Sequence, residues 1–129
     1  MALLLDSDVL IELERGAEAA ALDRFLGDDD RTISVITVSE LLHGVLRASG
    51  PIRTRRRAFV EHLLAGLEAI PITEPVARIH AEIWADLAQR GEVIGAHDLW
   101  IAATAIAHGL TLATGNTREF ERIQGLRLL

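Results

Sequence analysis

The chain has 129 residues, of which 50 % are hydrophobic and 25 % are charged, a balance typical of one globular domain and unlike a disordered or membrane-spanning chain. It contains no cysteine, which excludes disulfides and thiolate metal sites, and it begins without a basic leader or a long apolar run, so we expect a cytoplasmic protein with no membrane segment. The net charge of -6 argues against a broad basic surface for nucleic acid, and all 13 basic residues are arginine, which excludes mechanisms that need a lysine amine.

The N-terminal segment predicts a strand that leads into a helix. Residues 3–5 are an apolar run that ends abruptly at Asp6, and apolar residues resume three positions later. We therefore expect Asp6 at the carboxyl end of a strand, where its carboxylate is partly buried and needs a partner. Residues 17–26 predict the next helix, and residues 33–36 predict the second strand.

The middle of the chain predicts two further helices. Thr37 is expected to cap the first of them because Glu40 follows three residues later, and an apolar stripe continues to Leu46. This prediction places Glu40 in the first turn. After a loop at 48–51, the second helix runs to about residue 67 and begins with a cluster of basic side chains. This cluster consists of Arg53, Arg55, Arg56 and Arg57.

The C-terminal half predicts an alternation of strands and helices. A weak strand at 69–72 precedes a helix at 73–90, which has a proline in its first turn and a glycine just beyond its end. An aspartate opens the helix at 98–108, which is nearly all apolar and rich in alanine, so we expect it to be buried. Strands are expected at 110–114 and 126–128, with a polar turn between them.

This order of elements favours an α/β fold with a short central parallel sheet of about four or five strands, flanked by helices. No linker or repeat interrupts the chain, so we expect residues 1–129 to form a single domain. Ligands of such folds bind beyond the carboxyl ends of the strands, where we expect Asp6 and Asn116. Glu40 and Asp98 could converge on the same place, although helix starts also favour acidic residues for purely structural reasons.

Three segments resemble the PIN-domain ribonucleases, and most closely the VapC-type toxins of bacterial toxin–antitoxin pairs. They are LLLDSDVLIEL at 3–13, TVSELLHG at 37–44 and HDLWIAATAIAHGLTLATGNTREFERIQGLRL at 97–128. The resemblance depends on their order and spacing and spans nearly the whole chain. It implies a PIN-like fold and a metal-dependent endoribonuclease that hydrolyses RNA through a metal-activated water and is neutralised by a cognate VapB-type antitoxin.

The same resemblance assigns site residues. The implied ligands of Mg²⁺ or Mn²⁺ are Asp6, Glu40 and Asp98, with Asn116 as a fourth catalytic position. The implied supporting residues are Asp8, Thr114 and Glu119. Two positions depart from the family pattern: Asp8 stands where an asparagine is common, and Asn116 where many members have an aspartate. The first adds a negative charge and the second removes one, which favours one tightly held ion over two.

Other side chains predict contacts with partners. The basic cluster could steer RNA phosphates toward the acids or bind a partner protein. Trp84 and Trp100 lie on apolar helical stretches, so we expect core or interface residues in a homodimer rather than platforms for RNA bases. Among the histidines, His97 is the one expected near the site, because it precedes Asp98.

Two alternatives remain open. In the first, the protein is a non-catalytic interaction module whose acidic pocket binds an arginine of a partner, which is compatible with the ribonuclease. In the second, Asp6 and Asp8 are the nucleophile and acid of a haloacid-dehalogenase-like phosphatase. The lack of lysine and the presence of Leu10, where a small β-branched residue is expected, disfavour the phosphatase.

Overall fold

A computed structural model describes residues 2–16 and 30–129 of the chain. The helix expected at 17–26 lies outside the described residues. The strands are β1 (Leu3–Leu5), β2 (Arg31–Ser34), β3 (Glu68–Ile70), β4 (Thr111–Ala113) and β5 (Arg127–Leu128). They form one sheet in the order β3-β2-β1-β4-β5, and every pair of neighbours is parallel. The expected α/β fold with a short parallel sheet is confirmed.

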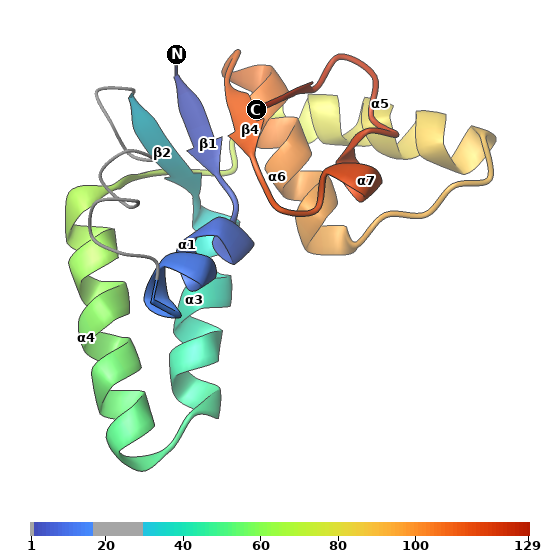
Figure 1. Ribbon diagram of the computed structural model, residues 1–129. Coiled ribbons are helices and arrows are strands. Elements are labelled where there is room, and N and C mark those ends of the chain that lie inside the picture. Colours follow the sequence, from blue (N-terminus) through green and yellow to red (C-terminus); the bar gives the residue numbers. More distant parts are fainter. Residues whose placement is uncertain (1, 17–29) are drawn as a thin grey trace.

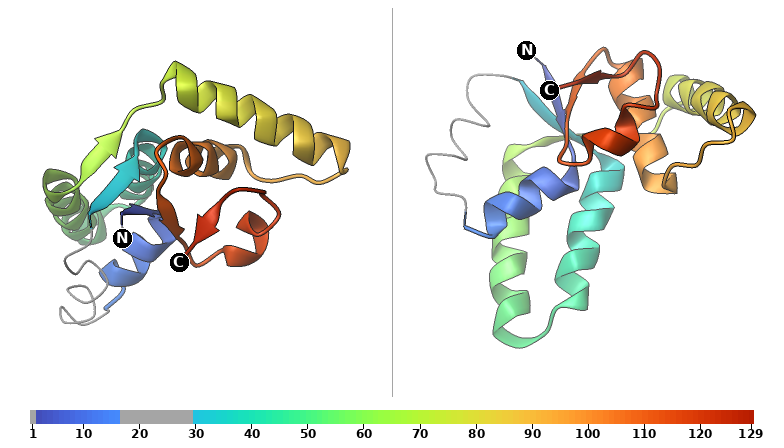
Figure 2. Two further views of the ribbon diagram at one scale, coloured as in Figure 1. Left: turned by 90° about the horizontal axis from the view of Figure 1, so that it is seen from above. Right: turned by 45° about the vertical axis from the view of Figure 1, so that its right-hand side comes forward.

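Helices cover both faces of this sheet (Figures 1 and 2). They are α1 (Ser7–Glu14), α3 (Val35–Arg47), α4 (Gly50–Gly66), α5 (Glu74–Gln89), α6 (Ala96–Ala107) and α7 (Thr117–Phe120). Helices α3 and α4 form a hairpin that projects beyond the carboxyl end of the sheet, while α5 and α6 pack together on the opposite side. None of the described helices is long and apolar enough to cross a membrane.

The central strand divides the core into two clusters because its side chains alternate between the faces. Leu4 is fully buried in the cluster formed mainly with α5 and α6. Leu3 and Leu5 are buried in the other cluster, which includes residues of α1, α3 and α4. A strand that is apolar at three successive positions is therefore explained by burial on both sides, as is usual in parallel sheets.

The start of α3 corrects one expectation. Strand β2 ends at Ser34, and the Ser34 hydroxyl accepts a hydrogen bond from the backbone N–H of Ile36 at 3.0 Å, so Ser34 caps the helix. Thr37 is not the cap but a buried residue inside α3. The helix therefore begins earlier than predicted, and Glu40 lies in its second turn. A first-turn position cannot explain this carboxylate, which weakens the purely structural interpretation of Glu40.

Other boundaries differ less. Helix α4 begins at Gly50, so the arginine cluster lies within its first turns rather than at its entrance. Helix α6 begins at Ala96, which leaves Asp98 in the first turn but not at the first position. The expected polar turn after β4 contains the short helix α7. Gly91 and Gly109 follow α5 and α6 with φ of +68° and +65°, a left-handed conformation that favours glycine and ends both helices.

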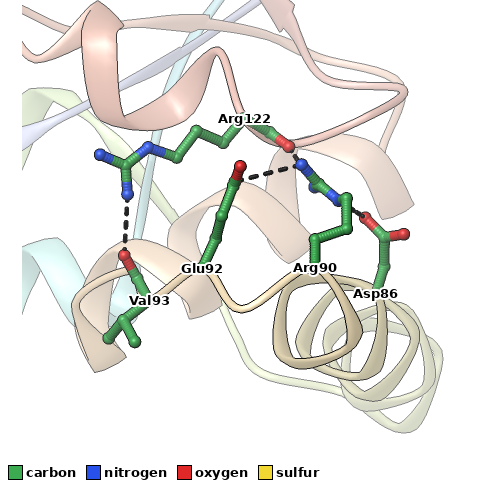
Figure 3. Close-up of polar contacts among 5 residues, drawn as sticks. All are labelled: Asp86, Arg90, Glu92, Val93 and Arg122. Carbon is green, nitrogen blue, oxygen red and sulfur yellow. Dashed lines mark hydrogen bonds and ion pairs between the residues drawn. The ribbon is translucent and has the colours of Figure 1, made fainter.

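Two arginines fix the segment between α5 and α6 (Figure 3). Arg90 donates to Asp86 at 2.8 Å, to Glu92 at 3.1 Å and to the carbonyl oxygen of Arg122 at 2.6 Å. The Arg122 guanidinium in turn donates to the carbonyl oxygen of Val93 at 3.0 Å. These contacts tie the end of α5 and the following segment to the chain just beyond α7. They hold in place the backbone that leads to Asp98.

Candidate active site

The proposed site residues gather at the carboxyl edge of the sheet. Asp6 directly follows β1, and Thr114 directly follows β4, its neighbour in the sheet. The starts of α1 and α3 lie just beyond the same edge (Figure 1). Ligand sites of parallel α/β folds occur at this edge, and the carboxyl ends of adjacent strands bring together residues that are distant in the sequence.

Asp6 is the most deeply placed of the acids, with 5 % of its surface exposed. One carboxylate oxygen accepts the backbone N–H of Ser7 at 2.8 Å, and the other accepts the Thr114 hydroxyl at 2.8 Å. Burial raises the pKa of Asp6 to about 6, and repulsion from Asp8 and Glu40 adds to the rise, which the hydrogen bonds only partly offset. A proton or a cation near this carboxylate would therefore stabilise it.

Asp98 lies in the first turn of α6 and is partly buried. The pKa of Asp98 is raised to about 6, mainly by burial and further by repulsion from four other acids. These acids are Asp6, Glu119, Glu40 and Asp8. A helix N-terminus favours the charged form of an acid, so a raised pKa at this position shows that crowding and burial outweigh the helix dipole. The structure therefore brings the predicted acids together from four separate segments.

Glu40 joins the cluster from α3. Its carboxylate oxygens accept the Ser7 hydroxyl at 3.4 Å and lie 3.6 Å from Nδ1 of His97. These two contacts link α3 to the first turns of α1 and α6. His97, the histidine expected near the site, thus lies beside one of its acids.

Asp8 contacts the loop that follows β4. One of its carboxylate oxygens accepts the backbone N–H of Gly115 at 3.0 Å, and the other is buried without a hydrogen-bond partner among the described residues. A Cβ atom on Gly115 would lie 2.9 Å from the Asp8 carboxylate, closer than such atoms approach in proteins. Gly115 is therefore required for the close contact between this loop and Asp8.

The same loop carries Thr114, Asn116 and Glu119. The Asn116 backbone N–H donates to the Thr114 hydroxyl at 3.0 Å, and the Asn116 side-chain amide donates to Glu119 at 2.8 Å. The second oxygen of Glu119 accepts the backbone N–H of Gly95 at 2.9 Å, and these hydrogen bonds lower the pKa of Glu119. Sequence reasoning missed Ser7 and Gly95, the first of which stands inside the Asp6–Asp8 motif.

The chemistry of these donors fits a hard divalent cation. They offer carboxylate and amide oxygens, which Mg²⁺ and Mn²⁺ prefer, and Asp8 presents a buried oxygen without a partner. In residues 2–16 and 30–129, however, no three aspartate, glutamate or histidine side chains lie close enough to ligate one ion in their present orientations. Coordination by Asp6, Glu40 and Asp98 would therefore require side-chain rotations.

The four arginines of the basic cluster have different environments. Arg53 donates to the carbonyl oxygens of Leu46 and Ala48 at 2.7 and 2.6 Å and thereby caps the end of α3. Arg56 pairs with Glu14 of α1 at 2.9 Å. Arg55 and Arg57 are exposed and form no side-chain hydrogen bond or ion pair within the described part of the chain. Only these last two are free to contact a partner or RNA.

An apolar hollow lies between α5 and the start of α6, and residues of its wall, Ala96 and Leu99, flank the turn that carries Asp98. Its volume is about 640 Å³, and its wall includes Trp84, Trp100, His80 and Val93. His80 stacks on Trp100 with 3.6 Å between ring centroids. Trp84 and Val93 are 63 % and 83 % exposed. Of the two positions expected for Trp84, core or dimer interface, the core position is therefore wrong. The helical periodicity of Trp84 instead marks an apolar face that the described part of this chain leaves uncovered.

Fold and site together define a known class of protein. The chain belongs to the PIN-domain family, whose model matches residues 3–126. Its relatives include proteins named VapC, which confirms the resemblance seen in the sequence. It is 38 % identical to the ribonuclease VapC1 of Rickettsia felis, over 100 % of this chain and 96 % of that protein. It is 33 % identical to the tRNA(fMet)-specific endonuclease VapC of Shigella flexneri, over 96 % of this chain and 93 % of that protein.

Solved structures agree with this assignment. VapBC2 from Rickettsia felis, bound to a DNA fragment from its promoter, contains a chain with a TM-score of 0.90 and 27 % identity, over 100 % of this chain and 98 % of that chain. DNA-bound VapBC from Salmonella typhimurium gives a TM-score of 0.90 and 32 % identity, over 100 % and 97 %. These neighbours are toxin–antitoxin complexes. The family that the chain belongs to is the PIN-domain family and not that of the haloacid-dehalogenase-like phosphatases.

Proposed function

We propose that this protein is a metal-dependent endoribonuclease toxin that acts in the cytoplasm on RNA. One observation carries the proposal. The buried Asp6 and the partly buried Asp98 lie near each other at the edge of the sheet, where Glu40 and Asp8 add further negative charge, and the pKa of both Asp6 and Asp98 is raised to about 6. Such an arrangement is costly in an isolated chain, and a cation bound between the acids would offset this cost.

We further propose Asp6, Glu40 and Asp98 as the ligands and Asn116 as a fourth polar contact. Mg²⁺ or Mn²⁺ held there would neutralise charge on phosphate oxygens and make water a better nucleophile. The residues of this chain have distinct parts in that chemistry. The Thr114 hydroxyl and the Ser7 N–H orient Asp6. His97 lies beside Glu40, where its imidazole would compete with a cation for that carboxylate.

Cleavage of purified RNA tests the proposal. The relative from Shigella flexneri is named a tRNA(fMet)-specific endonuclease, so a tRNA pool is the substrate of choice. We expect wild-type protein to cut it with Mg²⁺ or Mn²⁺ present and to stop when EDTA is added. The Asp6→Ala variant should be inactive. Unchanged cleavage by this variant would contradict the proposed site.

A VapB-type antitoxin is the proposed partner. The neighbouring structures from Rickettsia felis and Salmonella typhimurium are VapBC complexes, and their chains cover the whole of this one. The acidic pocket could receive an arginine of such a partner, so the interaction-module alternative describes the inhibited state rather than a rival function. Co-purification with the antitoxin should abolish cleavage, and removal of the antitoxin should restore it. Protein that stays inactive after removal, with metal present, would leave binding as the sole function.

We also propose that the apolar hollow is the interface of a homodimer. In a two-fold dimer the same patch of both copies meets, so the exposed Trp84 of one copy can cover apolar surface of the other. Trp84 and Val93 together present a large apolar surface on one face. Sedimentation of the wild-type protein should show a dimer at micromolar concentration.

A further inference from the structure

We propose that Glu119 is a positioning residue that holds Asn116 and the start of α6 in one rigid arrangement at the acidic site. The inference rests on the proposed function, because it concerns how that site is held. Glu119 itself was expected only to assist, without a stated role. Its contacts assign one.

The carboxylate of Glu119 bridges two segments that are distant in the sequence. One oxygen accepts the Asn116 amide at 2.8 Å, and the other accepts the Gly95 N–H at 2.9 Å, across 24 residues of chain. Both oxygens therefore have a donor. Charge-assisted hydrogen bonds of this kind are stronger and more directional than those between neutral groups. A side chain with both oxygens engaged has one orientation.

The first contact decides how Asn116 presents its amide. Because the NH₂ group donates to Glu119, the carbonyl oxygen is the end of the side chain that remains available as an acceptor. That oxygen is the atom of Asn116 that could contact a cation or orient a water. An aspartate at position 116 would instead face Glu119 with a like charge. The contact thus accounts for the neutral residue at a position where an acid is common in the family.

The second contact fixes the beginning of α6. Gly95 is the N-cap residue of this helix, and it has no side chain to satisfy the backbone. Its carbonyl oxygen accepts the first helical hydrogen bond from Leu99 at 3.0 Å, so a shift of Gly95 shifts the turn that carries Asp98. A Cβ on Gly95 would lie 3.5 Å from the Asp98 carboxylate and 4.0 Å from that of Glu119. The carboxylates of Glu119 and Asp98 therefore both lie beside this glycine.

Exchanging the donor and the acceptor of the Asn116–Glu119 hydrogen bond tests whether Glu119 positions Asn116 or only stabilises the fold. In Glu119→Gln, the glutamine can still accept from Gly95, but its NH₂ group then faces the NH₂ group of Asn116, and two donors cannot bond. The double variant Asn116→Asp/Glu119→Gln reverses the polarity of that hydrogen bond and keeps the net charge of the wild type. Glu121→Gln is the matched control, because Glu121 is exposed and makes no side-chain hydrogen bond or ion pair within the described residues.

Mn²⁺ titration, amide hydrogen exchange at Gly95, and kcat and KM for tRNA cleavage are the readouts. For Glu119→Gln we expect a Kd for Mn²⁺ about 10-fold higher, a similar fall in kcat at unchanged KM, and faster exchange at Gly95, as is typical when the support of a metal ligand is removed. The double variant should recover Mn²⁺ affinity to within about threefold of the wild type. The Tm of the single variant should match that of the control.

Two results would overturn the inference. One is a Glu119→Gln protein that binds Mn²⁺ and exchanges Gly95 as the control does. The other is a double variant that is as impaired as the single one. Wild-type protein that binds Mn²⁺ but cuts no RNA would instead overturn the proposed function, and the Mn²⁺ and exchange data would still decide the role of Glu119.

Discussion

The carboxyl edge of the sheet and the apolar hollow beside Trp84 both reduce the stability of an isolated chain, but in opposite ways. At the edge, Asp6 is 95 % buried among other acids, so its negative charge is withdrawn from water and two hydrogen bonds compensate it only in part. At the hollow, Trp84 and Val93 leave apolar surface in water. A bound cation would relieve the first arrangement, and a second apolar surface would relieve the second. The difference predicts two separate binding events, and we expect that each can be disrupted without the other.

The largest effect is expected at the edge. Asp98→Asn removes the charge that repels Asp6 but keeps the shape of the side chain, so we expect the fold to be retained and the proposed metal ligand to be lost. We expect cleavage of tRNA to fall by at least about 100-fold, a loss typical of removing electrostatic stabilisation from an active site. Sedimentation should still show the dimer. A variant that loses the dimer and the activity together would show that the two regions are coupled.

The next effect is expected at the hollow. Trp84→Ala should weaken the dimer by about 30-fold, or ~2 kcal/mol, because exposed tryptophans at the centre of an interface often dominate its binding energy. Leu46→Ala is the matched control, since Leu46 is 57 % exposed but lies on α3, away from the hollow. Sedimentation equilibrium of both variants is the measurement. Equal dimer constants would place the interface elsewhere.

These two regions also show what could be predicted from the sequence. The position of Asp6 was predicted correctly because a buried strand that ends in an acid has a clear local pattern. The periodicity of Trp84 was recognised as well, but an apolar helical stripe looks the same whether its own chain or a second copy covers it. Burial depends on tertiary packing, which the stripe does not contain. The metal-ligand roles of the acids stay a prediction.

Local patterns also failed in two places near the site. Ser34 and Thr37 are both suitable caps three residues apart, and the apolar Val35 and Ile36 between them favour a strand as much as a helix. Tertiary packing selected the earlier cap. The bridge from Glu119 to Gly95 could not be predicted at all, because it depends on the packing of α7 against the start of α6.

A smaller effect tests the claim that crowded acids destabilise the metal-free chain. The folded-state pKa of Asp6 is about 6, above the ordinary value of 3.8, so its contribution to stability is fully present below about pH 4 and is lost as the pH rises through 6. We therefore expect Asp6→Asn to raise the free energy of unfolding by roughly 1–2 kcal/mol at pH 7.5 in EDTA, and to have little effect at pH 4. Urea unfolding at both pH values measures this.

Bound metal should reverse the order of stability of the wild type and Asp6→Asn. We expect Mn²⁺ to bind the folded wild type more tightly than the variant, so saturating Mn²⁺ at pH 7.5 should stabilise the wild type relative to Asp6→Asn. A metal-free wild type that is more stable than the variant at pH 7.5 would contradict the view that the edge is under electrostatic strain.

The smallest effect is expected from the basic cluster. This region is a third case beside the acidic edge and the apolar hollow, because its charge is positive. Arg55 and Arg57 are the two exposed arginines of the cluster without contacts in the described chain, so their replacement by glutamine should leave the fold unchanged. If the two arginines steer phosphates toward the acids, the KM for tRNA should rise about threefold when they are replaced. The slope of log KM against log salt concentration should also fall by about one for each arginine, since each loses about one phosphate contact. Arg53→Gln is the control. Because Arg53 caps α3, its replacement should lower the Tm without changing this salt slope. If instead the double replacement leaves the salt slope intact but weakens antitoxin binding, the two arginines serve the partner protein, and RNA reaches the acidic edge without their help.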